Sequence, residues 1–228
     1  MRGRYAPFFV LRIIMKELII ADDHPLFREA LGASVKRLYP QVNLLEAATI
    51  DALMEVVEQH PEADLLLLDL TMPGATGYSA LVNLRANYPQ LPVMMISAHE
   101  DPQLMRRALD LGAMGFIPKS ASTELLTEAL EAVMMGNVWA PEEVYEAQPL
   151  AEEERNAVEL LQTLTPQQFR VLQMVSQGLL NKQIAYELGV TEATVKTHMT
   201  AILRKLGVTN RTHAVLVAQN LSLPHEAN

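Results

Sequence analysis

The chain has 228 residues, of which 50% are hydrophobic and 20% charged, and it contains no cysteine. This length allows one large domain or two modest ones, each able to bury a core without disulfide or metal staples. The absence of thiols excludes disulfide scaffolds, thiolate zinc sites, iron–sulfur clusters and cysteine nucleophiles, and it suits a reducing compartment. The longest stretch without Asp, Glu, Lys or Arg covers 15 residues, 70–84. A membrane helix needs about 20 apolar residues, so we expect a cytoplasmic protein without membrane contact.

The net charge of −9 is unevenly distributed along the chain. Residues 1–140 carry a net charge of −6, residues 141–162 another −6, and residues 163–228 a net charge of +3. The acidic total argues against a protein that binds nucleic acid over its whole surface. The weakly basic last third is compatible with a local nucleic-acid contact. An ordinary solvated surface explains the same charge, so a sequence motif is needed to distinguish it from a nucleic-acid contact.

Residues 1–15 precede the first regular pattern. This segment begins with basic residues, but Arg12 interrupts its apolar run and no small-residue cleavage site follows. These features are not those of a signal peptide. We therefore expect an N-terminal extension, with Met15 as the natural start.

Short apolar runs alternate with helical patterns from residue 16 to residue 136. The runs cover residues 18–21, 42–45, 65–68, 93–96 and 114–117. Between them, apolar residues recur at helical spacing in the sets Leu26/Ala30/Leu31/Val35, Leu53/Val56/Val57, Leu81/Leu84, Leu104/Ala108/Leu111 and Leu125/Leu126/Ala129/Val133. Continuous apolar runs are typical of strands buried on both faces of a parallel sheet. Five such repeats predict an α/β fold, a doubly wound five-stranded parallel sheet of the flavodoxin type.

Residues 137–162 contain Pro141, Pro149 and three consecutive glutamates. This composition predicts a linker, with a helix starting near Val158. Residues 163–228 then show four helical patterns. The first follows Thr165 and Pro166, a capping residue with proline at the first helical position, and stops at Gly178.

The second pattern follows Asn181 as its cap and ends at Gly189, the third follows Thr191, and the fourth runs from Arg211 to Leu221. Two short helices joined by Gly189 and Val190 have the proportions of a helix-turn-helix. We therefore predict a second, all-α helix-turn-helix domain over residues 163–228.

Acidic side chains gather at the predicted strand ends. Asp22 and Asp23 follow the first strand, and Asp69 follows the third. Because the carboxyl ends of parallel strands form one edge of a sheet, these carboxylates should meet there and repel one another unless a hard cation such as Mg²⁺ lies between them. The fourth strand is followed by Ser97 and the fifth by Lys119, a hydroxyl and a flexible charge suited to a phosphate.

Together these residues predict a phosphoryl-acceptor site. Asp69 would be the nucleophile that forms an acyl phosphate, while Mg²⁺, Ser97 and Lys119 neutralise the transferred oxygens. Each residue alone has an ordinary structural explanation, as a helix cap or a surface charge, but their common register with five strands favours a site.

Residues 16–136 resemble a response-regulator receiver domain. The motifs are Ala21-Asp22-Asp23-His24-Pro25, Asp69-Leu70-Thr71-Met72-Pro73-Gly74, Ser97-Ala98 and Phe116-Ile117-Pro118-Lys119-Ser120. The resemblance implies that Asp23, Asp69 and the backbone carbonyl of Thr71 bind Mg²⁺, that Asp22 acts through water, and that a histidine kinase supplies the phosphoryl group. It also places Phe116 at the aromatic switch position. His99 lies at a position where such proteins vary a residue that tunes the acyl-phosphate lifetime. Alternatively, His99 is a plain surface histidine.

The third C-terminal helix has a polar face opposite its apolar stripe. At 100° per residue, Thr197 and Thr200 lie on that face, with Lys196 on one flank and Thr194 and Lys205 on the other. Small side chains let a helix approach base edges, and Lys reaches bases or phosphates. An ordinary amphipathic surface helix has the same periodicity.

Residues 163–221 resemble the LuxR-type helix-turn-helix. The motifs are Leu164-Thr165-Pro166, Gly178, Asn181-Lys182-Gln183-Ile184-Ala185, Leu188-Gly189-Val190, Thr194-Val195-Lys196-Thr197-His198, Lys205-Leu206-Gly207-Val208 and Asn210-Arg211. With the receiver, the whole chain is similar to NarL/FixJ-type transcription regulators. The resemblance implies base contacts by Lys196, Thr197 and Thr200, phosphate contacts by Lys182, Thr194 and Lys205, and a homodimer seam along the last helix.

The chain departs from that family pattern at two places. Gln167 and Gln168 replace an Arg-Glu pair, which removes an ion pair typical of the first helix. Thr200 stands where a lysine is common, which leaves the preferred base sequence open.

Three other function classes compete with a transcription regulator. A phosphatase or phosphotransferase with an aspartate nucleophile requires a second Asp where Thr71 stands, and it requires a cap segment. An oxidoreductase requires a Gly-x-Gly-x-x-Gly after a strand, and none is present. A receiver controlled by a ligand would not need the intact acidic site.

The sequence also predicts how the two domains are coupled. A phosphoryl group on Asp69 would draw Ser97 and Lys119 toward it, and Phe116 would follow inward. The surface formed by the fourth helix, fifth strand and fifth helix would change and release the DNA-binding domain for homodimerisation on double-stranded DNA.

Overall fold

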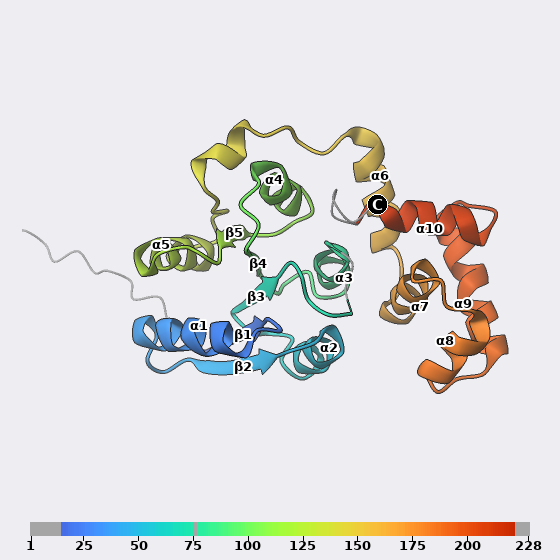
Figure 1. Cartoon of the computed structure of the whole chain (residues 1–228), viewed down its shortest axis with the longest axis horizontal. Helices are drawn as coiled ribbons and strands as arrows, with labels where there is room; N and C mark the ends of the chain where they lie inside the picture. Colours follow the sequence, from blue (N-terminus) through green and yellow to red (C-terminus); the bar gives the residue numbers. More distant parts are fainter. Residues whose placement is uncertain (1–14, 75–76, 222–228) are drawn as a thin grey trace, which may run out of the picture.

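The computed structural model describes residues 15–74 and 77–221. Residues 1–14, almost all of the predicted extension, lie outside the described residues, whereas Met15 is buried in the core. Figure 1 shows an α/β unit with a central sheet and, beside it, a purely helical unit. Both units agree with the predicted fold classes.

All five strands of the sheet are parallel, in the order β2-β1-β3-β4-β5. Their bounds are β1 Glu17–Ala21, β2 Asn43–Ala47, β3 Leu65–Asp69, β4 Val93–Ser97 and β5 Gly115–Pro118. The strand order reverses between β1 and β3. These two strands are hydrogen-bonded neighbours, and their register begins with Leu18 paired with Leu65. In doubly wound sheets, functional residues gather at the carboxyl ends of the strands beside such a switch point.

Helices cover both faces of the sheet. Their bounds are α1 Pro25–Leu38, α2 Ile50–Gln59, α3 Ser79–Asn87, α4 Pro102–Asp110 and α5 Thr123–Met134. Side chains of successive strand residues alternate between two core clusters: Leu18 and Ile20 pack with residues of α1 and α5, whereas Ile19 packs with residues of α2, α3 and α4. Burial on both faces explains why the strands are continuous apolar runs.

Only part of the apolar set that recurs at helical spacing in α1 is buried. The side chains of Leu31 and Val35 are buried as expected, but Ala30 is exposed and Leu26 is 81% exposed. Leu26 and Ala30 lie four residues apart and share one face, whereas Leu31 and Val35 share another. Only the second face meets the sheet.

The segment after α5 is more ordered than the predicted linker. Trp139 forms a parallel bridge with Gly115 at the free edge of β5: the Phe116 N–H donates to the Trp139 carbonyl (3.1 Å) and the Trp139 N–H donates to the Met114 carbonyl (3.0 Å). A Cβ at position 115 would lie 2.9 Å from the Trp139 carbonyl oxygen, so this approach requires glycine. The 3₁₀ helix η1 (Glu142–Glu146) and helix α6 (Glu152–Gln162) follow.

Four further helices form the C-terminal unit. They are α7 Pro166–Ser176, α8 Asn181–Glu187, α9 Glu192–Lys205 and α10 Arg211–Gln219. Thr165 and Gln168 make a capping box at the start of α7, and the Thr191 hydroxyl caps α9 as predicted. The prediction of Asn181 as the cap of α8 is wrong: Leu180 holds that position, and Asn181 instead accepts a hydrogen bond from Arg211.

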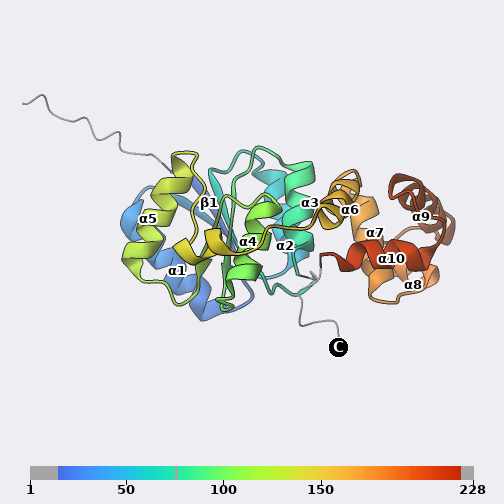
Figure 2. The ribbon, with the colours of Figure 1, turned by 90° about the horizontal axis from the view of Figure 1, so that it is seen from above.

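The two units contact each other through α3 and α4 on one side and α6, α7 and α10 on the other, which Figure 2 shows from above. The Tyr78 N–H, at the start of α3, donates to the Leu221 carbonyl just after α10 (2.8 Å). The Gln173 side chain of α7 donates to the Ser79 hydroxyl (2.8 Å). Among the described residues, none of the helices is long and apolar enough to cross a membrane.

Candidate phosphoacceptor site and DNA-binding surface

The predicted site residues meet at the carboxyl edge of the sheet. Asp22 directly follows β1, Asp69 is the last residue of β3, Ser97 is the last residue of β4, and Lys119 directly follows β5. The parallel register brings these positions together although they are spread over 98 residues of sequence. Asp22, Asp69 and Ser97 are buried, an environment in which a polar side chain requires a partner.

The carboxylates form a cluster with the donor set of a hard cation. Asp22, Asp23, Asp69 and His24 each offer a ligand atom, and these atoms lie within 4.8 Å of one another. The Asp69 Oδ1 atom is buried and has no hydrogen-bond partner among the described residues. His24 Nδ1 lies 2.8 Å from Asp23 and 3.1 Å from Asp22. Several carboxylate oxygens, one of them buried without a partner, fit Mg²⁺.

Lys119 bridges two of the three carboxylates. Its Nζ lies 2.7 Å from Asp22 Oδ2 and 3.0 Å from Asp69 Oδ2, and 4.8 Å from the centre of the Phe27 ring. Burial acts to lower the pKa of Lys119, but the hydrogen bonds and charges of Asp22 and Asp69 outweigh it, so that the pKa is raised. Lys119 therefore stays protonated at neutral pH and places a fixed positive charge beside Asp69.

Two hydroxyls complete the site. Thr71 Oγ1 donates to Asp69 Oδ2 (3.2 Å), and Ser97 Oγ accepts from the backbone N–H of His99 (3.0 Å). The His99 ring also lies against Ser97, with Nδ1 3.3 Å from Oγ. This contact places the exposed residue His99 beside Ser97, and both of its predicted roles stay predictions.

Phe116 lies in the inward position. Its side chain is fully buried, at 0% exposure, in the core cluster that also contains Ala140 and Val144. Its N–H donates to the Trp139 carbonyl beside the bridge between Gly115 and Trp139. The predicted movement of Phe116 on phosphorylation stays a prediction.

The polar face of α9 is exposed as predicted. Lys196, Thr197 and Thr200 are exposed, and Thr194 is half-buried. Lys196 forms an i,i+4 ion pair with Glu192 (3.2 Å), a pair that solvent screens. In both views α9 lies at the end of the helical unit remote from the sheet (Figures 1 and 2).

The two remaining lysines of the predicted DNA surface differ from each other. Lys182 is exposed on α8, whereas Lys205 Nζ donates to the Thr163 carbonyl (2.7 Å) and to Gln168 Oε1 (2.8 Å). The expected loss of an ion pair at Gln168 is therefore partly compensated, because the amide oxygen keeps a hydrogen bond to Lys205. These two acceptors use two of the three N–H donors of Lys205, so its ammonium group can keep both and still contact a phosphate.

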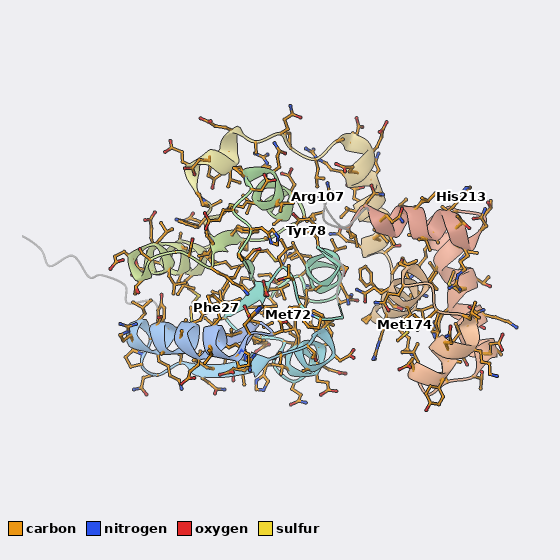
Figure 3. All side chains as sticks on the ribbon, in the orientation of Figure 1. Phe27, Met72, Tyr78, Arg107, Met174 and His213 are labelled. Atoms are coloured by element: carbon orange, nitrogen blue, oxygen red, sulfur yellow. The ribbon has the colours of Figure 1, made fainter. Side chains whose placement is uncertain are left out.

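Arg107 is a residue that the sequence did not single out. On α4, its Nη1 donates to Glu154 of α6 (3.0 Å) and its Nη2 to the Asn220 carbonyl at the end of α10 (2.6 Å). Its guanidinium carbon also lies 5.9 Å from the centre of the Tyr78 ring. Both residues are labelled in Figure 3. Burial raises the pKa of Tyr78, whose hydroxyl donates to the Leu104 carbonyl (2.8 Å). No local pattern predicts Arg107, because its partners lie up to 113 residues away.

Two family models match the chain. Residues 18–131 match the response regulator receiver domain, and residues 162–218 match the bacterial regulatory proteins of the luxR family.

Individual relatives span almost the whole chain. The glycerol metabolism activator of Pseudomonas putida is 43% identical, over 91% of this chain and 96% of its own length. The probable transcriptional regulatory protein NarL of Mycobacterium tuberculosis is 34% identical, over 90% of this chain and 94% of its own length. Among solved structures, RcsB of Salmonella enterica serovar Typhimurium bound to a promoter with the phosphomimetic BeF₃⁻ is 26% identical, with a TM-score of 0.52, over 91% of this chain and 99% of its own. The chain therefore belongs to the response regulators that regulate transcription, with a receiver domain followed by a LuxR-type DNA-binding domain.

Proposed function

We propose that Asp69 accepts a phosphoryl group from a histidine kinase and that this modification controls DNA binding by the C-terminal domain. The observation that carries the proposal is the buried Asp69 carboxylate: its Oδ1 atom has no hydrogen-bond partner within residues 15–74 and 77–221, and Lys119 lies 3.0 Å from its Oδ2 atom. A free oxygen on a carboxylate beside a fixed cation is what an attacking nucleophile needs.

The transfer forms a bond between an Asp69 oxygen and phosphorus. It breaks the P–N bond of the donor phosphohistidine, whose imidazole leaves with the electron pair and takes up a proton. Asp23, Asp69 and the Thr71 carbonyl would hold Mg²⁺ directly and Asp22 through water, and the bound ion would supply Lewis-acid stabilisation of the phosphoryl oxygens. Lys119 neutralises the anionic product, and the hydroxyl of Ser97 donates a hydrogen bond to a phosphoryl oxygen.

Incubation with radiolabelled acetyl phosphate and MgCl₂ tests the site. We expect one label per wild-type chain and none on Asp69→Asn. Asp64→Asn is a matched control, because Asp64 accepts hydrogen bonds from the Lys16 and Glu17 N–H groups outside the site and its replacement should label normally. Labelling of Asp69→Asn would refute the phosphoacceptor, and sustained turnover would indicate a phosphatase or phosphotransferase instead.

We propose that α9 enters the major groove of double-stranded DNA, with Lys196, Thr197 and Thr200 at base edges and Lys182 and Thr194 at phosphates. Their exposure and the remote position of α9 support this role. A cytoplasmic location follows from the proposed DNA target. Two copies joined along α10 would present two recognition helices to half-sites about one DNA turn apart.

We propose that the domain junction couples the two sites. The Tyr78 N–H and Arg107 both hold the end of α10, the proposed dimer seam, and Tyr78 ends the loop that begins at Asp69. A phosphoryl group that shifts this loop weakens the hold on α10 while leaving α9 accessible throughout. Resting protein would then bind DNA weakly as a monomer and tightly once α10 is free to pair.

A further inference from the structure

We infer that Thr197 and Thr200 read A·T base pairs, through contact between their methyl groups and the thymine C5-methyl groups. This inference rests on the proposed placement of α9 in the major groove. Thr200 stands where a lysine is common, which left the preferred base sequence open, and this inference states that preference.

The hydrogen bonds of the two hydroxyls carry the argument. Thr197 Oγ1 donates to the Ala193 carbonyl (3.0 Å), and Thr200 Oγ1 donates to the Lys196 carbonyl (3.0 Å). Each hydroxyl hydrogen is therefore used within the helix, as is common for threonine in helices. The exposed side chain then offers DNA a methyl group and an acceptor oxygen, but no donor.

The four base pairs present different groups to such a side chain. An A·T pair presents in the major groove the thymine methyl group, which accepts apolar contact, and the adenine N6 amino group, which donates. A G·C pair presents the guanine acceptors N7 and O6, which a threonine without a free hydrogen cannot satisfy, and the cytosine N4 amino group, which donates as adenine N6 does. The thymine methyl group is therefore the feature by which the threonine distinguishes A·T from G·C. A lysine at position 200 would have the opposite preference, because its ammonium group only donates.

The spacing of the threonines places the two A·T pairs next to each other. Between Thr197 and Thr200 the α-helix rises by about 4.5 Å, and the two side chains point in directions about 60° apart around the helix axis. Successive base pairs are about 3.4 Å apart. We therefore expect thymines, on either strand, in two neighbouring base pairs of each half-site, with Lys196 beside them where a guanine would be read.

The test uses deoxyuridine, which differs from thymidine only by the missing methyl group. Duplexes are first selected from a random library with acetyl-phosphate-treated full-length protein, and each thymine of a selected half-site is then replaced by deoxyuridine. Loss of one buried methyl contact should weaken binding about fourfold. We expect this loss at two neighbouring base pairs and an unchanged affinity at the others.

Two matched variants at each position separate the methyl group from the hydroxyl. Thr197→Ser and Thr200→Ser keep the hydroxyl and should each lose the distinction between thymine and deoxyuridine at one base pair. Thr197→Val and Thr200→Val keep a methyl group and should retain it. Circular dichroism confirms that each variant is folded.

The outcomes distinguish this inference from the proposed function. If deoxyuridine binds like thymine everywhere while Lys196→Ala still weakens binding, the methyl contact is wrong and the recognition helix stands. If Lys196→Ala also binds every duplex normally, the recognition helix itself is misassigned. A requirement for guanine at both positions would likewise overturn the inference.

Discussion

Replacement of Arg107 by alanine should open the domain junction. The guanidinium is 17% exposed and makes two contacts across the junction, an ion pair with Glu154 and a hydrogen bond to the Asn220 carbonyl. Its contact with the Tyr78 ring lies within the receiver domain. Both contacts across the junction are lost in Arg107→Ala, whereas each domain keeps its own core.

The two contacts across the junction together contribute about 1.5 kcal/mol to its closure. Glu154 is 34% exposed, which limits the ion pair to about 0.5 kcal/mol. The hydrogen bond to the half-buried Asn220 carbonyl contributes about 1 kcal/mol. A change of about 1.5 kcal/mol shifts the ratio of closed to open molecules about 10-fold.

Two measurements without acetyl phosphate check this prediction. Small-angle scattering should show a larger radius of gyration for Arg107→Ala, and its affinity for selected DNA should rise by up to about 10-fold toward that of the phosphorylated wild type. Arg106→Ala is the matched control, because Arg106 pairs with Asp110 on its own helix in the i,i+4 position. An unchanged radius and affinity for Arg107→Ala, or equal changes in both variants, would refute the coupling through Arg107.

Three further changes follow from the contacts described above. Gly115→Ala should break the bridge to Trp139 and cost about 1–2 kcal/mol of stability, and the fluorescence of Trp139, the one tryptophan in the sequence, should shift to the red; an unchanged spectrum would contradict this. Gln168→Glu should stabilise the protein by about 0.5–1 kcal/mol by pairing with Lys205 near the start of α7, while Gln167→Glu, which lacks that partner, should raise the melting temperature less. Tyr78→Phe should cost about 0.5–1.5 kcal/mol at pH 7 by removing the buried hydrogen bond to the Leu104 carbonyl. Because folding raises the pKa of Tyr78 above 10.0, its hydroxyl contributes fully below pH 10 and less as the pH rises further, so the wild type should lose more stability than Tyr78→Phe between pH 10 and 11; parallel losses would contradict this.

The sequence predicted the elements that depend on local patterns. Five buried strands, the caps at Thr165 and Thr191 and the gathering of Asp22, Asp69, Ser97 and Lys119 at one edge follow from apolar runs, capping chemistry and the geometry of parallel sheets. The gathering needs no knowledge of long-range contacts, because every parallel strand ends at the same edge.

Features set by tertiary contact escaped prediction. Leu26 and Ala30 recur at helical spacing with Leu31 and Val35, but this spacing does not indicate which face of the helix meets the sheet. The bridge from Gly115 to Trp139 beside Phe116 depends on an edge that only the folded sheet exposes, and the movement of Phe116 stays a prediction. The contacts of Lys205 and Arg107 join residues far apart in the sequence, and neither residue differs in its local pattern from an ordinary surface cation.

The most direct test of phosphorylation-controlled DNA binding compares wild type with Asp69→Asn. The dissociation constant for a selected duplex is measured with and without acetyl phosphate and MgCl₂, together with the molecular mass in solution. We expect the wild type to dimerise and to gain about 5- to 150-fold in affinity, the usual range of allosteric coupling. Asp69→Asn should keep its fold and a weak basal affinity but gain nothing. An equal gain in both proteins, or a phosphorylated wild type with unchanged affinity and mass, would contradict this mechanism.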